Sequence, residues 1–174
     1  MTTINGIMEV TLVSARGLKD TEIFGKVDPY VVLEYKSQQQ KSSTGRGKAS
    51  RRSHMKWCMC LRGQGTSPVW NEKFKFKVEY PAAGAGEQEQ YKLLLKVVDH
   101  DNFTNDDCLG QATIYLKELF ERGLEKGNAE IPTQKYRVVS EDKSYNGEIQ
   151  VGITFTTKVE TDEKEYGGWK ESQY

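Results

Sequence analysis

The sequence lacks the signals of secretion, membrane insertion and lipid attachment. Its first stretch, MTTINGIMEVTLV, has no basic region followed by a continuous apolar run, which argues against a signal peptide. No segment approaches the roughly 18 consecutive apolar residues that a spanning helix needs. Residue 2 is threonine and the chain ends in ESQY, so the myristoyl and prenyl signatures are absent as well. We therefore expect a cytoplasmic protein.

Net charge and cysteine are also scarce. Lys+Arg and Asp+Glu number 25 each, so the net charge does not indicate a nucleic-acid or membrane partner. Only local clusters of charge can indicate one. The three cysteines, Cys58, Cys60 and Cys108, are an odd number without a secretory signal, and we expect them to be reduced thiols. A length of 174 residues suits one domain.

Helical periodicity is confined to one short segment, YLKELFERG, in which Leu116, Leu119 and Phe120 are spaced for one helix face. Elsewhere apolar residues alternate with polar ones, as in KFKFKV and EIQVGITFT, or form the short runs YVVLEY and YKLLLKVV. About eight strands at short spacing predict an antiparallel β-sandwich. Residues from about 157 onward lack alternation and are expected to form a polar tail beyond a domain at 1–156.

If the strands run simply up and down, the first, third and fifth connections fall at the same end of the sandwich. The first lies between Val13 and Tyr30, the third extends roughly from Thr44 to Pro68, and the fifth lies within KVVDHDNFTNDDCLG, residues 96–110. The first and fifth connections are both acidic. We therefore predict that their carboxylates converge.

These carboxylates are Asp20, Glu22, Asp28, Asp99, Asp101, Asp106 and Asp107. Oxygen ligands on converging loops suit Ca²⁺, which takes roughly 6–8 of them in a flexible geometry. Without an ion the anions would repel one another, so ion binding should stabilise the fold. The alternative is that they are ordinary solvated loop residues.

Enzymatic interpretations find little support. The pair Asp99 and Asp101 resembles the nucleophile loop of haloacid-dehalogenase-type phosphatases, but those enzymes need a parallel α/β sheet and crossover helices. An EF-hand loop would have a ligand where Phe103 stands and a glycine at its sixth position. His54, His100 and the cysteines form no catalytic constellation, and Cys58-Met-Cys60 lacks the usual zinc spacing. We expect no enzymatic activity.

Three motifs in order resemble the C2 domain, the calcium- and phospholipid-binding β-sandwich. They are DPYV, then SPVWNEKFKF, then the spacing D-x-D-x(5)-D-x-x-G from Asp99 to Gly110. Because the chain begins with the strand before the first acidic loop, the resemblance is to the circular variant called type II topology. The chain is also similar to the small single-domain plant C2 proteins of the elicitor-responsive type. That similarity implies a calcium-signalling or defence-response effector.

The resemblance implies Ca²⁺ as cofactor, with ligands at Glu22, Asp28, Asp99, Asp101 and Asp107. Glu22 stands where the family normally has Asp, so its longer side chain can shift or weaken one ion site, and Asp20 can substitute for it. In the family, anionic lipid completes the coordination of the ions. This implies a monomer that associates peripherally with the plasma membrane, with Phe24, Phe103 and Trp57 as membrane-inserting side chains. The alternative is a calcium-independent protein-interaction sandwich.

Two basic features lie outside this pattern. A loop insertion at about 45–64 carries Arg51, Arg52 and Trp57 and contains no acid. It either attracts anionic lipid or is a disordered insertion that leaves the fold intact, and no stacking platform for nucleic acid accompanies it. One strand face carries Lys73, Lys75 and Lys77. This face is either a solvated surface or, as the family resemblance implies, a phosphoinositide-binding surface.

Overall fold

The computed structural model describes residues 3–19, 28–44, 67–81, 90–100 and 106–158. Its elements are β1 (Thr3–Arg16), β2 (Pro29–Tyr35), β3 (Gln38–Lys41), β4 (Val69–Pro81), β5 (Lys92–Asp99), β6 (Asp107–Tyr115), α1 (Lys117–Lys126), β7 (Asn128–Val139) and β8 (Tyr145–Lys158). The predicted all-β class with one short helix is confirmed. No helix in the described part of the chain is long and apolar enough to cross a membrane.

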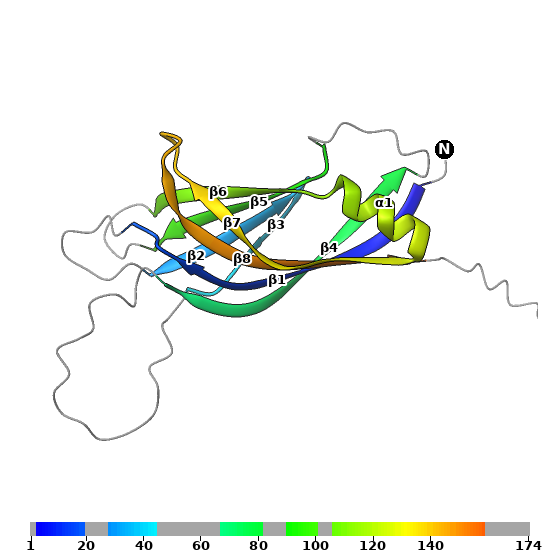
Figure 1. The fold of residues 1–174 in the computed structure, drawn as a ribbon, viewed down its shortest axis with the longest axis horizontal. Coiled ribbons are helices and arrows are strands. Elements are labelled where there is room, and N and C mark those ends of the chain that lie inside the picture. Colours follow the sequence, from blue (N-terminus) through cyan, green and yellow to red (C-terminus); the bar gives the residue numbers. More distant parts are fainter. Residues whose placement is uncertain (1–2, 20–27, 45–66, 82–89, 101–105, 159–174) are drawn as a thin grey trace, which may run out of the picture.

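The strands pair in the order β3-β2-β5-β6-β7-β8-β1-β4, and every pairing is antiparallel. β6 and β7 share a single register pair, Gln111 with Val139, so the sheet folds there into two layers. One layer is β3-β2-β5-β6 and the other is β7-β8-β1-β4, as Figure 1 shows. The first strand lies between β8 and β4, which is the arrangement expected for type II topology.

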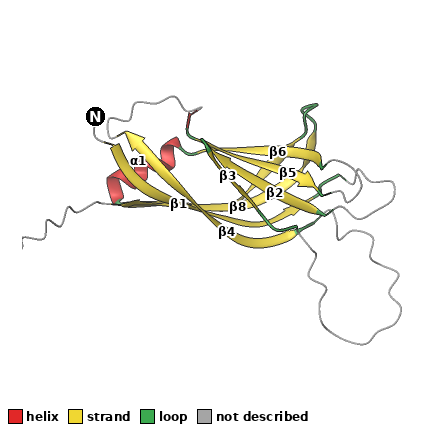
Figure 2. Cartoon of the chain, turned by 180° about the vertical axis from the view of Figure 1, so that it is seen from behind, coloured by secondary structure: helices red, strands yellow, loops and turns green. Residues whose placement is uncertain are grey.

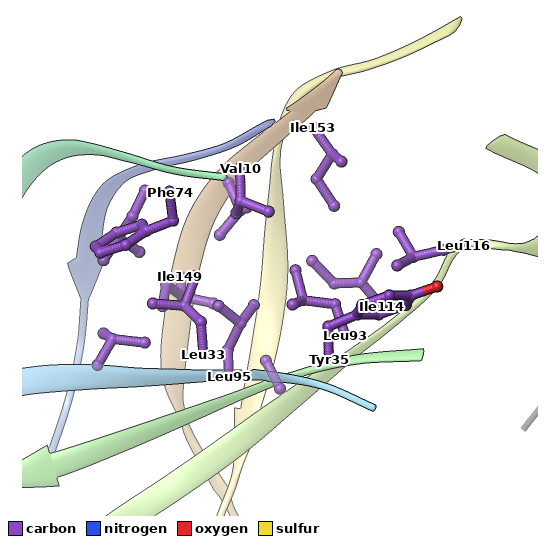
Figure 3. Packing of buried hydrophobic residues seen from close by; sticks show 14 of the residues in the cluster. Val10, Leu33, Tyr35, Phe74, Leu93, Leu95, Ile114, Leu116, Ile149 and Ile153 are labelled. Atoms are coloured by element: carbon purple, nitrogen blue, oxygen red, sulfur yellow. The ribbon is translucent and has the colours of Figure 1, made fainter. Parts of the chain in front are cut away.

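Alternation places one apolar face of each layer inside. In β4 the buried residues Trp70, Phe74, Phe76, Val78 and Tyr80 alternate with exposed ones over most of the strand. Figure 3 shows side chains from both layers, among them Val10, Phe74, Leu33 and Leu95, filling the space between the sheets. Each large apolar side chain buried in this way contributes about 1.5–3 kcal/mol.

The helix closes one end of the sandwich (Figure 2). Leu119 and Phe120 of α1 and Leu116 just before it are buried, as their spacing predicts. The Phe120 ring centroid lies 4.8 Å from that of Phe155 and 6.1 Å from that of Tyr35. Gly127 ends the helix with a φ of 80°, a conformation that glycine adopts without strain.

The two outer edges of the layers, β3 and β4, are joined by side chains rather than by a strand ladder. Gln38 donates to the Lys77 carbonyl at 2.6 Å and accepts from the Lys77 N–H at 2.9 Å. Gln40 donates to the Lys75 carbonyl at 2.6 Å. This glutamine bridge nearly closes the sandwich into a barrel.

The last strand, β8, continues to Lys158. Its final residues are held because Gly6 and Asn5 of β1 pair with Thr157 and Lys158. Backbone pairing needs no apolar side chain, so alternation in the sequence does not mark this end of the strand.

Candidate functional site

The ends of β2, β5 and β6 bring three of the predicted carboxylates to one end of the sandwich. Pro29 pairs with Asp99, and Asp99 pairs with Asp107. Asp28 directly precedes Pro29, so Asp28, Asp99 and Asp107 stand on neighbouring strands. We call this the acidic end. It lies opposite α1 (Figure 1).

The other predicted connections open at the acidic end as well. The Ala15 N–H donates to the Pro68 carbonyl at 3.0 Å, so β1 ends beside the start of β4. Lys41 at the end of β3 pairs with Val32 near the start of β2. The prediction that the first, third and fifth connections share one end is therefore confirmed by the residues that flank them.

Asp99 is the buried member of the group. It follows Leu93, Leu95 and Val97 in the inward alternation of β5 and is only 2% exposed. Its Oδ1 accepts the Asp28 N–H at 2.8 Å, while the His100 N–H donates to the Asp28 carbonyl at 3.3 Å. A buried carboxylate is unfavourable unless hydrogen bonds or an opposite charge compensate it, and the Asp28 N–H supplies one such bond. These contacts fix the carboxylate at the mouth of the sandwich.

Asp28 and Asp107 are exposed beside it. All three carboxylates are hard oxygen donors, so the chemistry of the set fits Ca²⁺ rather than a soft metal. Within the described ranges, however, no group of three or more His, Cys, Asp or Glu side chains is placed so that it could hold a metal ion. The three described strand ends therefore bring carboxylates together but do not form a metal-binding group by themselves.

The remaining predicted site residues lie outside the described residues. They are the ligands Asp20, Glu22 and Asp101, the membrane-inserting Phe24, Phe103 and Trp57, and the basic Arg51 and Arg52. Their roles stay predictions.

Asp106 is a residue of this end whose contacts the sequence did not reveal. Its Oδ2 accepts a 2.6 Å hydrogen bond from the Tyr30 hydroxyl, and its Oδ1 lies 3.2 Å from His100 Nδ1. Burial, followed by the hydrogen bond and charge of Asp106, raises the pKa of Tyr30 to about 12. Lys41 Nζ lies 3.6 Å from the centroid of the Tyr30 ring. Asp106 thus fastens the start of β6 to β2, and His100, expected to be inert, is one of its partners.

Asn146 is a second residue that sequence reasoning missed. It lies near the start of β8 and is only 3% exposed; it accepts the Lys19 N–H at 2.7 Å and donates to the Leu109 carbonyl. Lys19 leads into the first acidic connection and Leu109 follows Asp107. The contact joins residues far apart in the chain, so no local pattern could have indicated it.

Lys73, Lys75 and Lys77 point outward from β4, as their alternation predicts. Lys73 Nζ lies 2.9 Å from the Glu9 carboxylate of the neighbouring strand. The hydrogen bond from Lys73, with the charges of Lys73 and Lys75, lowers the pKa of Glu9 against a smaller effect of burial. This lysine row therefore has an acid beside it, and its role in lipid binding stays a prediction.

Comparison with known proteins agrees with this architecture. The sequence model of the C2 domain family matches residues 6–131. The chain belongs to the C2 domain family. C2 domains generally bind Ca²⁺, and membership supports a membrane-binding or signalling role. A solved structure of a C2 domain-containing protein superposes with a TM-score of 0.60 at 34% identity, covering 93% of this chain and 97% of that one.

Two relatives match this C2 domain over nearly its full length. The 16 kDa phloem protein 1 of Arabidopsis thaliana is 41% identical over 170 residues, which cover 97% of each chain. Elicitor-responsive protein 1 of Oryza sativa subsp. japonica is 42% identical over 173 residues, covering 97% of this chain and 96% of the relative. The predicted resemblance to small elicitor-responsive C2 proteins is confirmed.

Proposed function

We propose that this C2 domain binds Ca²⁺ at the acidic end and thereby attaches to anionic phospholipid membranes. The observation that carries the proposal is the alignment of Asp28, Asp99 and Asp107 on three adjacent strand ends. Asp99 is buried and oriented by the Asp28 N–H. Asp101 and Glu22, with Asp20 as a substitute, complete the proposed ligand set.

Bound calcium neutralises the carboxylates and offers coordination positions to lipid phosphate or carboxylate groups. The Asp28 N–H donates to the Asp99 carboxylate and the His100 N–H donates to the Asp28 carbonyl, so Asp28 and Asp99 hold each other in position. Phe24, Phe103 and Trp57 are the proposed membrane-inserting side chains. Each would contribute about 1.5–3 kcal/mol if it were fully buried.

The proposal extends to the organisation and setting of the protein. We infer one C2 domain with a basic insertion at about 45–64 and a polar C-terminal tail, acting as a monomer without enzymatic activity. It would reside in the cytoplasm and move to the plasma membrane in calcium signalling or defence responses. Arg51 and Arg52 of the insertion, and the lysine row, would add electrostatic attraction to anionic lipid, including phosphoinositides.

A calcium-independent protein-interaction sandwich is the second candidate. Two observations favour it: Glu22 replaces the usual aspartate, and the described carboxylates do not by themselves form a metal group. In that case the acidic end would be a surface for a basic protein partner.

Co-sedimentation with phosphatidylserine-containing vesicles, in calcium and in chelator, distinguishes the two. We expect the parent protein to bind only in calcium, and the Asp99→Asn/Asp101→Asn variant to lose that binding, because the ligand charges are removed. A Glu125→Gln variant, altered at the opposite end on α1, is the matched control and should bind like the parent. Equal binding in chelator would indicate that the basic residues attract the membrane. No binding in either condition would favour the protein-interaction sandwich.

A further inference from the structure

The tip of the β7–β8 hairpin, residues 139–147, is a fourth connection at the acidic end. We call it the rim hairpin. In Figure 1 it is the orange turn at the left, on the same side as the ends of β5 and β6. Asn146 joins it both to Lys19, which leads into the first acidic connection, and to Leu109, which follows Asp107. The rim hairpin is therefore attached to both acidic segments.

The rim hairpin is held tightly rather than extended loosely into solvent. Gly147 has a φ of 91°, and a Cβ there would lie 2.5 Å from the Arg16 carbonyl oxygen. Only glycine allows so close an approach to the end of β1. Within the turn, the Ser140 N–H donates to the Ser144 carbonyl at 3.0 Å, and the Lys143 N–H donates to the Ser140 carbonyl at 2.9 Å. A side chain on this hairpin keeps its position relative to the acidic end.

Two exposed apolar side chains project from the rim hairpin. Val139 pairs directly with Tyr145, so both lie on the same side of the hairpin. Tyr145 is 55% exposed and Val139 is 36% exposed. Tyrosine suits a membrane interface, because its ring is apolar and its hydroxyl stays hydrated.

Exposed apolar side chains are unevenly distributed between the two ends of the sandwich. Among the residues that the structure describes, the exposed large hydrophobic side chains are Val69, Tyr115, Val139 and Tyr145. Val69 begins β4 beside Ser14 at the acidic end, where the rim hairpin also lies. Tyr115 alone stands at the helix end, opposite Lys92. Three of the four thus lie at the end of the sandwich that the proposed function turns toward the bilayer.

Charge on the rim hairpin is nearly balanced. Its turn carries Glu141 and Asp142 against Lys143, and the Lys19 ammonium lies 3.5 Å from the Ser144 hydroxyl. The two acids outnumber the lysine, so the hairpin carries no net positive charge with which to attract anionic lipid. Whatever it adds to binding must come from apolar contact after the acidic end has docked.

We propose that the rim hairpin is an additional membrane-contacting element, which places Tyr145 and Val139 in the headgroup layer of an anionic phospholipid bilayer. The inference rests on the proposed function, since it requires the acidic end to face the membrane. The rim hairpin carries none of the predicted calcium ligands or membrane-inserting residues, so its contact with the bilayer is additional to theirs. The hairpin contributes to affinity but not to the calcium requirement.

The test compares Tyr145→Ala with Tyr115→Ala, which removes a similarly exposed tyrosine from the opposite end. Partitioning onto vesicles of phosphatidylserine and phosphatidylcholine is titrated in saturating calcium. We expect Tyr145→Ala to bind about tenfold more weakly, Tyr115→Ala to bind within about twofold of the parent, and Tyr145→Phe to retain most of the affinity. The calcium concentration for half-maximal binding, at lipid levels adjusted to equal binding, should be the same in all variants.

A second measurement keeps the inference testable if an alanine variant is unstable. Tyr145→Trp and Tyr115→Trp are mixed with vesicles containing brominated lipid, and the quenching of each is compared with that of the parent. Extra quenching at position 145 alone supports the contact. Parent-like binding of Tyr145→Ala, or equal quenching at both positions, overturns it and leaves the rim hairpin to a protein partner. If the parent itself fails to bind vesicles in calcium, the proposed function fails first and this inference falls with it.

Discussion

Single hydrogen bonds give the carboxylates of the acidic end different surroundings. Asp99 and Asp107 come from paired positions on β5 and β6, yet Asp99 is buried while Asp107 is exposed. Asp106, next to Asp107 in the chain, bonds to Tyr30 and contacts His100. Adjacent aspartates therefore have different surroundings: Asp106 fastens β6 to β2, whereas Asp107, the proposed ligand, is exposed beside Asp99.

Tyr30 gives this arrangement a pH signature. Because its pKa is raised to about 12, the folded state favours the neutral hydroxyl. The corresponding stability is complete below the unfolded pKa of about 10 and is lost as the pH rises through the folded pKa. We expect the free energy of unfolding, measured in urea between about pH 8 and 11, to fall more steeply for the parent than for Tyr30→Phe. Tyr145→Phe, changed at an exposed site, should follow the parent, whereas identical slopes for the parent and Tyr30→Phe would contradict the assignment.

At the scale of the element, β4 combines a buried apolar face with an outer lysine row. The Lys73–Glu9 pair on that face is exposed, and such pairs contribute little to stability. Its more important effect is on the outer potential, because Glu9 offsets part of the positive charge that Lys73, Lys75 and Lys77 present. Glu9 therefore reduces how strongly this face can attract an anion.

The lysine row can be tested by changing one charge at a time. If it binds phosphoinositides, Glu9→Gln should strengthen and Lys75→Gln should weaken binding to phosphoinositide vesicles, each about fivefold, since one charge near such a surface is worth about 1 kcal/mol. Lys126→Gln on α1 is the control and should have no effect. Phosphatidylserine vesicles of matched surface charge should respond less, and equal responses on both vesicle types would mean that the face is merely a solvated, basic surface.

At the scale of the whole molecule, the proposed calcium site predicts that ion binding is coupled to folding. The described carboxylates stand at the ends of β2, β5 and β6, so an ion that bridged them would join strands that are distant in the sequence. A ligand that binds only the folded state stabilises it by about 2.7 kcal/mol at one hundred times its dissociation constant. For a chain of this size we expect calcium to raise the melting temperature by roughly 5–10 °C. Asp99→Asn should abolish the rise, and magnesium at equal concentration should give a smaller one.

Much of this architecture is predictable because it follows from local periodicity. Alternation in segments such as KFKFKV identifies strands and their inward faces, and an up-and-down order then places the acidic connections at one end. Side-chain contacts across the molecule have no such signature. Asn146 binds Lys19 across 127 positions, and Asp106 reaches Tyr30 across 76. Alternation does not reveal the difference between Asp106 and Asp107, because the two are adjacent in the chain and only the fold separates their partners.

The glutamine bridge between β3 and β4 has a consequence for molecules gathered on a membrane. An open edge strand offers unpaired N–H and C=O groups that a neighbouring chain can extend into a shared sheet. Attachment to a surface brings copies close together and would favour such polymerisation. Gln38 and Gln40 already occupy backbone groups of Lys75 and Lys77, so this edge has less to offer another copy. If the proposed function holds, these two polar side chains would help domains that are crowded on a membrane to remain separate molecules.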